Sequence, residues 1–366
     1  MESMKNKGRN YSEFVFLSAG PVGDHALIID YANRFFESTG KPSTILLKHP
    51  NTFLRDMAIP YYDHISYIPF LGLKGKVETF LFALTSIWKK RCYVLVLPIP
   101  PPRYLTVFAR YINSLTHSRM IALDSPCGFI LPGGPFPSGQ FVGEGNYIPA
   151  NVDKELYYEE ANQMLQFLGY ESVPRVPHLA YVDTPSVVSE YALTDVEYIA
   201  MHIKASGPDR SLPADRWNVI IKTLAEKLPN TAFVFTGTNA DMDFISESAR
   251  GIEENRVRYL SGVSTQELLT VYAHAKMCVT VHTGNAHLIN MLHVPCVTVN
   301  FKGVHMFRFD YNEKGVDLYS EKGCTCNPYE RRCSMVEYRG QEYMACLFNL
   351  TNEEIVNAIV KRYPSE

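Results

Sequence analysis

Short apolar runs alternate with longer segments of mixed polarity along the whole chain. Runs of this kind in the first half occur at 14–18, 43–49, 64–68, 93–98 and 119–124. They recur in the second half at 198–204, 232–237, 257–262, 277–282 and 296–301. Each run has the length and composition of a buried strand, and the segments between them are long enough for helices. This alternation predicts an α/β protein with parallel sheets covered by helices.

The chain has 366 residues, which is long for a single core, so two domains are expected. We predict an N-terminal Rossmann-like domain over 1–173 and a C-terminal one over 186–350. The proline-punctuated segment 174–185 has no regular period and is the predicted linker. The last residues, 351–366, are expected to form a C-terminal helix that could pack back on the N-terminal domain.

Residues 125–150 interrupt the pattern. They contain six glycines and five prolines, so no regular element is expected there. A long irregular segment inside a compact chain is typically functional. We therefore expect a lid on the acceptor side of a binding site, with Phe141 and Tyr147 in it.

Charge and apolar length limit the possible partners. The 35 Lys and Arg residues nearly balance the 38 Asp and Glu residues, so the net charge of −3 gives no overall field that would recruit nucleic acid. No uninterrupted apolar stretch is long enough to span a bilayer. A cytoplasmic location is expected, with at most peripheral membrane contact through the apolar and then basic segment 77–91.

Four cysteines crowd one short region near the carboxyl end. They are Cys324, Cys326, Cys333 and Cys346. Four thiolates could hold a structural Zn or Fe ion, although their spacing lacks the paired C-x-x-C units of a typical zinc site. Ordinary thiols that pack a loop are the alternative.

The sequence "VHTGNAH" joins an apolar strand to a helix that is expected to begin near Asn285. Free N–H groups at the start of such a helix favour an anion. Gly284 permits a tight turn, the Thr283 hydroxyl can cap the helix or donate to a phosphate, and His287 lies in the first turn. The alternative is a capped, short crossover helix with the histidines merely packed or solvated.

Three stretches of the second half carry a family resemblance. "HIKAS", "DRSLPADRW" and "VHTGNAHLINMLHVPCVTV" resemble the patterns H-P-G-A-S, W-P-x-E-x-W and D-T-G-x-x-H-L of the heptosyltransferase family, glycosyltransferase family 9. The amino-terminal "FLSAGPVGDHALIID" is similar to the family's opening strand and Gly-Asp loop. The resemblance implies the GT-B architecture, with two Rossmann-like domains facing each other across a central cleft.

The resemblance also implies a site for inverting sugar transfer without a catalytic cofactor. Asp24, after Gly23, is the candidate base that deprotonates the acceptor hydroxyl. Where the family has Asp before Thr-Gly, this chain has His282, which changes the part of the pocket that handles the nucleoside. The sequence "DMD" at 241–243 is interpreted as first-turn acids of a helix and not as a metal motif. The predicted donor-binding residues are Lys204, Ser206, Arg210, Ser261, Gly262, His282, Thr283, Gly284, Asn285 and His287.

The expected activity is transfer of a sugar, with a heptose as one candidate, from a nucleotide-diphosphate donor. The acceptor would be a glycan, a glycolipid or a protein, as in the biosynthesis of lipopolysaccharide or another glycan. Two alternatives remain: a sugar-nucleotide epimerase of GT-B-like fold, and a non-catalytic nucleotide-binding protein of the same fold.

Overall fold

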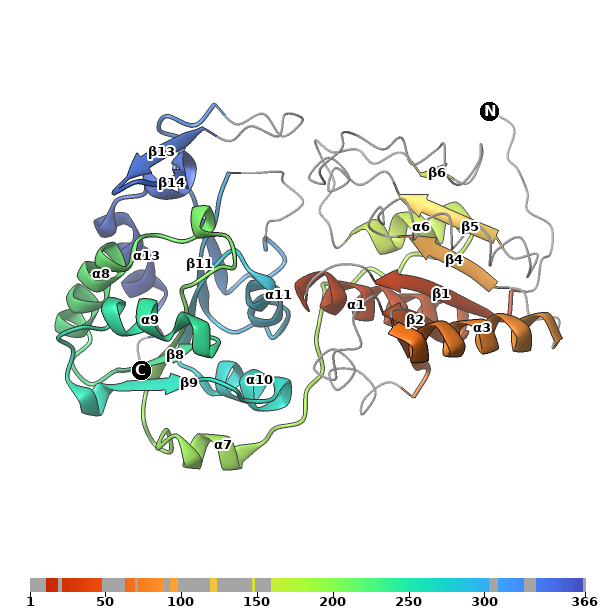
Figure 1. Cartoon of the computed structure of the whole chain (residues 1–366), viewed down its shortest axis with the longest axis horizontal. Coiled ribbons are helices and arrows are strands. Elements are labelled where there is room, and N and C mark those ends of the chain that lie inside the picture. Colours follow the sequence, from red (N-terminus) through yellow and green to blue (C-terminus); the bar gives the residue numbers. More distant parts are fainter. Residues whose placement is uncertain are drawn as a thin grey trace. The chain divides into compact units, whose positions relative to one another are not determined.

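The computed structural model of the chain separates into two compact units, Met1–Val176 and Pro177–Glu366 (Figure 1). Their boundary falls inside the proline-punctuated segment 174–185. The structure describes residues 11–18, 22–47, 63–69, 72–88, 93–97, 119–123, 147–148, 159–302, 309–325 and 334–364. In this part of the chain, no helix is long and apolar enough to cross a membrane.

The first unit is a parallel sheet with helices packed against it. The strand order is β3-β2-β1-β4-β5-β6, and each neighbouring pair is parallel. The strands are β1 (Glu13–Ser18), β2 (Ser43–Leu47), β3 (Ile65–Pro69), β4 (Tyr93–Leu97), β5 (Arg119–Leu123) and β6 (Tyr147–Ile148). The helices are α1 (Val22–Thr39), α3 (Gly72–Trp88) and α6 (Glu160–Leu168). The first five strands confirm the apolar runs of the sequence to within two residues.

One expectation for the first unit is wrong. Residues 125–150 were expected to form no regular element, yet β6 pairs with β5 through Ala122↔Tyr147 and Leu123↔Ile148. Two residues with strong strand preference suffice because an existing parallel edge supplies the hydrogen-bonding partners. Tyr147 therefore lies in a strand, whereas Phe141 lies outside the described residues.

The second unit is also a parallel sheet, in the order β12-β11-β10-β7-β8-β9. Its strands are β7 (Tyr198–His202), β8 (Ala232–Thr236), β9 (Val257–Leu260), β10 (Met277–Val281), β11 (Cys296–Val299) and β12 (Gly315–Leu318). Its main helices are α7 (Pro185–Glu190), α8 (Ala214–Lys227), α9 (Met242–Ser248), α10 (Thr265–His274), α11 (Gly284–Met291) and α13 (Asn352–Arg362).

Both faces of this second sheet are buried. Ile199, Phe233 and Phe235 belong to one apolar cluster, whereas their strand neighbours Ala200 and Val234 belong to another. Because side chains alternate along a strand, the two clusters lie on opposite faces of the sheet. The nearly continuous apolar runs in the sequence arise from this double burial. Together with the first unit, this confirms the predicted class of two α/β domains built on parallel sheets.

The carboxyl-terminal elements complete the second unit. The strand β12 and the hairpin β13 (Met335–Tyr338) and β14 (Gln341–Met344) were not predicted, because their alternation is polar and their burial is partial. Ile355, Val356 and Ile359 of α13 lie in the core of this unit. The terminal helix therefore packs within the second unit, which differs from the expectation that it could pack back on the N-terminal domain.

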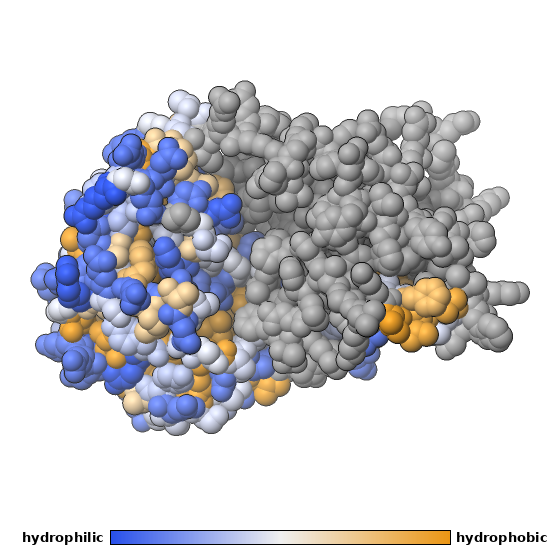
Figure 2. Space-filling view, viewed as in Figure 1, coloured by the Kyte–Doolittle hydropathy of each residue, from blue (hydrophilic) through white to orange (hydrophobic). Residues whose placement is uncertain are grey.

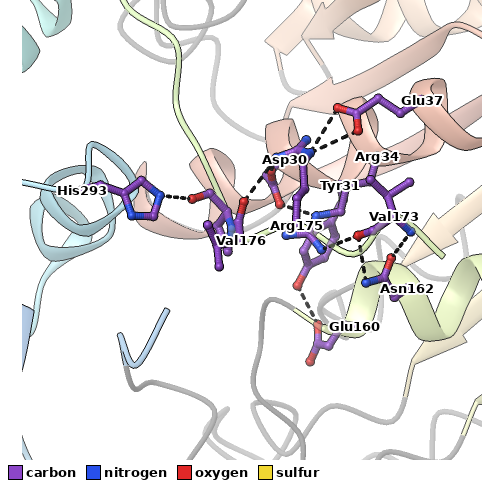
Figure 3. A network of polar contacts seen from close by, with 11 residues as sticks. Asp30, Tyr31, Arg34, Glu37, Glu160, Asn162, Val173, Arg175, Val176 and His293 are labelled. Carbon is purple, nitrogen blue, oxygen red and sulfur yellow. Dashed lines mark hydrogen bonds and ion pairs between the residues drawn. The ribbon is translucent and has the colours of Figure 1, made fainter. Parts of the chain in front are cut away.

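The last residues of the first unit are fixed to that unit by a polar network (Figure 3). Asp30 of α1 is fully buried and accepts hydrogen bonds from Arg34 Nε at 2.8 Å and Arg175 Nη1 at 2.6 Å. Val173 exchanges two hydrogen bonds with the side chain of Asn162, at 2.9 and 3.2 Å. Removing Asp30 would leave two guanidinium groups without this shared carboxylate.

The first residues of the second unit are fixed in a similar way. His293 Nε2 donates to the Pro177 carbonyl at 2.9 Å (Figure 3). The Leu179 N–H donates to the Met291 carbonyl at 3.2 Å. The chain therefore passes from one set of anchors to the other at the Val176–Pro177 linkage.

Candidate functional site

The junction between β10 and α11 has the geometry that the sequence predicts. The strand ends at Val281 and the helix begins at Gly284, so the start expected near Asn285 is confirmed to within one residue. Thr283 is the N-cap residue in an extended conformation, with φ −143° and ψ 177°, and its side chain makes no capping hydrogen bond. The hydroxyl of Thr283 is therefore not used by the helix that it precedes.

Three polar side-chain atoms at this helix start are buried. Thr283 Oγ1, Asn285 Oδ1 and His287 Nδ1 have no hydrogen-bond partner within the part of the chain that the structure describes. His287 is only 6 % exposed. Because a buried polar atom without a partner costs free energy, three such atoms around one helix start indicate a place for a polar ligand.

A series of hydrogen bonds holds the side-chain nitrogen of Asn285. Asn285 Nδ2 lies 3.1 Å from His202 Nε2, and His202 Nδ1 lies 3.1 Å from Thr236 Oγ1. Thr236 Oγ1 in turn lies 2.9 Å from the Tyr272 hydroxyl. Since the amide nitrogen can only donate, His202 Nε2 accepts, and its Nδ1 carries the proton that is donated to Thr236. These hydrogen bonds use the side-chain nitrogen of Asn285 and leave its Oδ1 atom available to accept a hydrogen bond.

His202 is a site residue that the sequence reasoning missed. It ends β7, the strand next to β10, so its ring reaches the start of α11. The signal was present, because His202 is the first residue of the quoted stretch "HIKAS". Only the pairing of β7 with β10 shows that it holds Asn285.

The three histidines of the site are neutral at pH 7. Burial lowers the pKa of His287 to about 4 and that of His202 to about 4. Burial, the His287 ring and the positive charge of Arg210 together lower the pKa of His282 to about 3. The structure thus brings the charge of Arg210 within range of His282. A bound anion would find one permanent cation and neutral imidazole donors here.

Aromatic rings surround the two neighbouring histidines. The His282 ring meets Phe301 edge to face at a centroid distance of 4.6 Å, and the His287 ring meets Phe309 at 4.9 Å. His282 therefore packs against apolar rings at the position where the family pattern has a carboxylate. A carboxylate would be poorly solvated in this place, which gives the substitution a physical reason.

The remaining predicted donor residues lie at different distances from this junction. Ser206 is exposed, and the Lys204 ammonium lies over the Phe244 ring, 4.6 Å from its centroid. Lys204 lines a separate cavity of about 230 Å³ together with Asp215 and Arg339. Ser261 and Gly262 follow the edge strand β9, three strands away from β10, or about 14 Å at the usual strand spacing.

Asp24 is the third residue of α1, which begins at Val22. Its side chain is outside the described part of the structure. The interpretation of "DMD" as first-turn acids is confirmed for Asp241, whose carboxylate accepts from the Thr238 N–H and hydroxyl at 2.9 and 2.7 Å. Among the described residues, no cluster of His, Cys, Asp and Glu could hold a metal ion.

The cysteine cluster is described only in part. Cys346 is buried and its sulfur accepts the Lys302 N–H at 3.3 Å, and Cys324 is partly buried. Cys326 and Cys333 lie outside the described residues. A backbone N–H aimed at a sulfur suits a thiolate, as it would in a metal site.

Comparison with known proteins relates these features to a family. Residues 164–332 match the model of glycosyltransferase family 9 (heptosyltransferase). No curated protein sequence matches the chain. The matched range contains every predicted donor residue and two of the clustered cysteines, Cys324 and Cys326.

Solved structures resemble the chain over nearly its whole length. The ADP-heptose LPS heptosyltransferase II of E. coli has a TM-score of 0.66 at 13 % identity, covering 96 % of this chain and 98 % of that one. A family 9 glycosyltransferase from Veillonella parvula has a TM-score of 0.70 at 15 % identity, covering 97 % and 98 %. The iron-containing dodecameric glycosyltransferase TibC from enterotoxigenic E. coli has a TM-score of 0.56 at 12 % identity, covering 97 % and 79 %.

The family match and the quoted motifs agree on the same residues, and both support a glycosyltransferase that uses a nucleotide-sugar donor. At these identities the solved structures show the fold alone. The resemblance to glycosyltransferase family 9, the heptosyltransferase family, is therefore confirmed for this chain, through its sequence over residues 164–332 and through its GT-B fold over nearly its full length.

Proposed function

We propose that this chain is an inverting glycosyltransferase that moves a sugar, with a heptose as one candidate, from a nucleoside diphosphate to an acceptor hydroxyl. The observation that carries the proposal is the start of α11, where Thr283 Oγ1, Asn285 Oδ1 and His287 Nδ1 are buried without partners among the described residues. A diphosphate with its attached sugar offers acceptors and hydroxyl donors that match these atoms.

The reaction is a single displacement at the anomeric carbon. Asp24 takes the proton of the acceptor hydroxyl, and the acceptor oxygen then forms the new bond to the anomeric carbon. The bond to the diphosphate oxygen breaks on the opposite face of the sugar, and the leaving group carries the negative charge away. The helix start, the Thr283 hydroxyl and the Arg210 cation stabilise that charge, since groups fixed in advance need no reorganisation.

The neutral histidines suit this arrangement. His287 Nδ1 can donate one hydrogen bond to a phosphate oxygen, whereas His282 packs on Phe301 where the nucleoside part of the donor is expected. A neutral ring can donate and accept, whereas a carboxylate only accepts. We therefore propose that the donor nucleotide of this chain differs from that of relatives with Asp at this position.

A panel of nucleotide sugars incubated with the pure protein tests the function. Release of nucleoside diphosphate that depends on an added acceptor supports glycosyl transfer. Conversion of the nucleotide sugar to an isomer would instead identify an epimerase. Binding of a nucleotide sugar without turnover, in the presence of glycan, glycolipid and protein acceptors, would identify the non-catalytic alternative.

Substitutions at the helix start test the diphosphate site. Thr283→Val and His287→Ala should each weaken nucleoside-diphosphate binding by roughly 1 to 3 kcal/mol, because each removes a hydrogen bond to a charged group. Binding of the unphosphorylated nucleoside should hardly change. Both affinities are measured by titration calorimetry.

Matched controls lie on the same unit away from the site. Thr223 on α8 is half-buried and its hydroxyl donates to the Val219 carbonyl of its own helix, and His274 has a side chain that is 42 % exposed. Thr223→Val and His274→Ala should leave diphosphate binding unchanged. Equal losses in the control and the site variants would contradict a diphosphate site at α11.

We also propose that Cys324, Cys326, Cys333 and Cys346 hold one structural iron or zinc ion. The N–H of Lys302 aimed at the Cys346 sulfur supports it, as does the likeness to an iron-containing glycosyltransferase. Protein purified without chelator should contain about one metal ion per chain, and Cys346→Ser should lose it. Cys278→Ser, at a thiol buried inside β10, should keep the metal. Metal-free wild-type protein would show that the cysteines only pack a loop.

The acceptor class and the cytoplasmic location stay predictions. A glycan, a glycolipid and a protein each offer the hydroxyl that the proposed displacement needs.

A further inference from the structure

Helix α3 of the first unit exposes four large apolar side chains. Val77, Phe80, Leu81 and Leu84 are 50, 61, 51 and 45 % exposed. Their spacing of three, four and seven residues places them on one face of the helix. Thr79, in contrast, is fully buried, and its hydroxyl donates to the Gly75 carbonyl at 2.7 Å.

An exposed apolar stripe of this kind is unusual for a helix in an ordinary soluble domain. Such a helix turns its widest apolar stripe toward the core, because burying Leu and Phe contributes most to stability. In the described part of the first unit, the only other exposed large apolar side chain is Val176. The patch formed by Val77, Phe80, Leu81 and Leu84 is visible as a group of orange atoms in Figure 2. Contiguous patches of this kind mark contact surfaces.

The charges along this segment are also unusual. Residues 72–91 contain five basic residues, Lys74, Lys76, Lys89, Lys90 and Arg91, and a single acidic one, Glu78. The segment thus has an excess of four positive charges within a chain whose net charge is −3. In the sequence, two of the basic residues precede the four exposed apolar residues and three follow them.

We propose that the α3 patch docks on an anionic phospholipid surface, with the helix lying in the plane of the interface. Apolar side chains would enter the boundary between headgroups and acyl chains, and the positive charge of the segment would be attracted to lipid phosphates. A second copy of the chain fits less well. A symmetric pair would place the same patch against itself and bring two such excesses of positive charge together.

This inference does not depend on the donor site or on the reaction. It rests on the exposure of four side chains of the first unit and on the charges of the same segment. A failure of the lipid experiment would therefore not contradict the proposed sugar transfer. A failure of the sugar-transfer experiment would likewise not contradict lipid docking.

Co-sedimentation with vesicles tests the docking. Vesicles of phosphatidylcholine containing roughly 30 % phosphatidylglycerol should bind the full chain, and binding should fall as salt rises or when the anionic lipid is omitted. Phe80→Ser combined with Leu81→Ser should lower the vesicle partition coefficient by about tenfold or more.

A matched pair of single variants provides the control. Val77 on α3 and Val219 on α8 are both 50 % exposed. Val77→Ser should weaken vesicle binding several-fold, whereas Val219→Ser should not. Equal binding by the wild type, the double variant and both single variants would overturn the proposal.

A spectroscopic readout provides a second test. A tryptophan placed by Phe80→Trp should shift its emission to shorter wavelength when the anionic vesicles are added, whereas Val219→Trp should not. The absence of a shift at both positions would overturn docking through α3. A lipid-free dimer of the wild type that the double variant abolishes would assign the patch to a second copy of the chain and also overturn the proposal.

Discussion

Asp24→Asn is expected to lower the rate of sugar transfer by about 100-fold or more, which corresponds to roughly 2.7 kcal/mol in the activation free energy. The asparagine amide has nearly the same shape as the carboxylate but cannot take the acceptor proton. Affinity for the donor should stay nearly constant, because the proposed diphosphate contacts belong to α11 of the other unit. Single-turnover rates and donor affinities of the two proteins check both parts of the prediction.

The position of Asp24 in the first turn of α1 gives the expectation its physical basis. Free N–H groups at a helix start stabilise a carboxylate in its ionised form, which is the form that a base needs. Asp63→Asn is the matched control, because Asp63 is a fully exposed aspartate of the same unit. An Asp24→Asn enzyme with wild-type turnover would show that another group removes the acceptor proton.

Most of the two sheets can be predicted from the sequence, because strands such as β7, β8 and β10 are buried along their whole length. Runs such as 232–237 and 277–282 are mainly apolar and do not alternate, and the structure places β8 and β10 there. The capping box from Ser264 to Glu267 likewise predicts the start of α10, where the Ser264 N–H donates to Glu267 Oε2 at 2.7 Å. Strong local signals of this kind do not depend on the rest of the fold.

The elements that escape prediction are stabilised by contacts distant in sequence. β12, with the sequence Gly-Val-Asp-Leu, is half-buried at all four positions and exists because β11 offers it a parallel edge. The same reasoning applies to β6, whose two residues pair with β5. Neither segment has an apolar period from which a strand could be recognised.

The residues of the candidate site also differ in whether local sequence or distant contacts determine their role. Thr283 and Gly284 are recognisable because a turn between a strand and a helix needs those residue types locally. The role of His202 depends on a partner 83 residues away in the chain, Asn285, and only the adjacency of β7 and β10 brings the two together. The exposed apolar face of α3 is a third example. The spacing of apolar residues in the sequence predicts a stripe along this helix, but it does not predict whether the stripe faces the core or the solvent.

The free energy of unfolding of the second unit is expected to fall by about 4 kcal/mol between pH 7 and pH 5, because of His202 and His287 alone. Both are more than nine-tenths buried, and burial lowers the pKa of each to about 4, against 6.5 in an unfolded chain. Between these values the unfolded chain binds protons that the folded chain excludes. Stability therefore decreases as the pH falls below about 6.5, at about 2 kcal/mol per histidine by pH 5. His282, with a pKa of about 3, adds to the loss in the same direction.

Urea unfolding at several pH values measures this loss. The chain has two tryptophans, and Trp217 is fully buried in the second unit, so a Trp88→Phe background makes fluorescence report that unit alone. His287→Gln should reduce the drop between pH 7 and pH 5 by about 2 kcal/mol, because one of the protons that the folded chain excludes is no longer counted. His274→Gln, at a side chain that is 42 % exposed, should keep the full drop. A stability that stays constant from pH 7 to pH 5 would mean that these imidazoles accept protons in the folded state. The anion site at α11 would then carry positive charge on its histidines, and diphosphate binding would strengthen in acid instead of being limited by the loss of the fold.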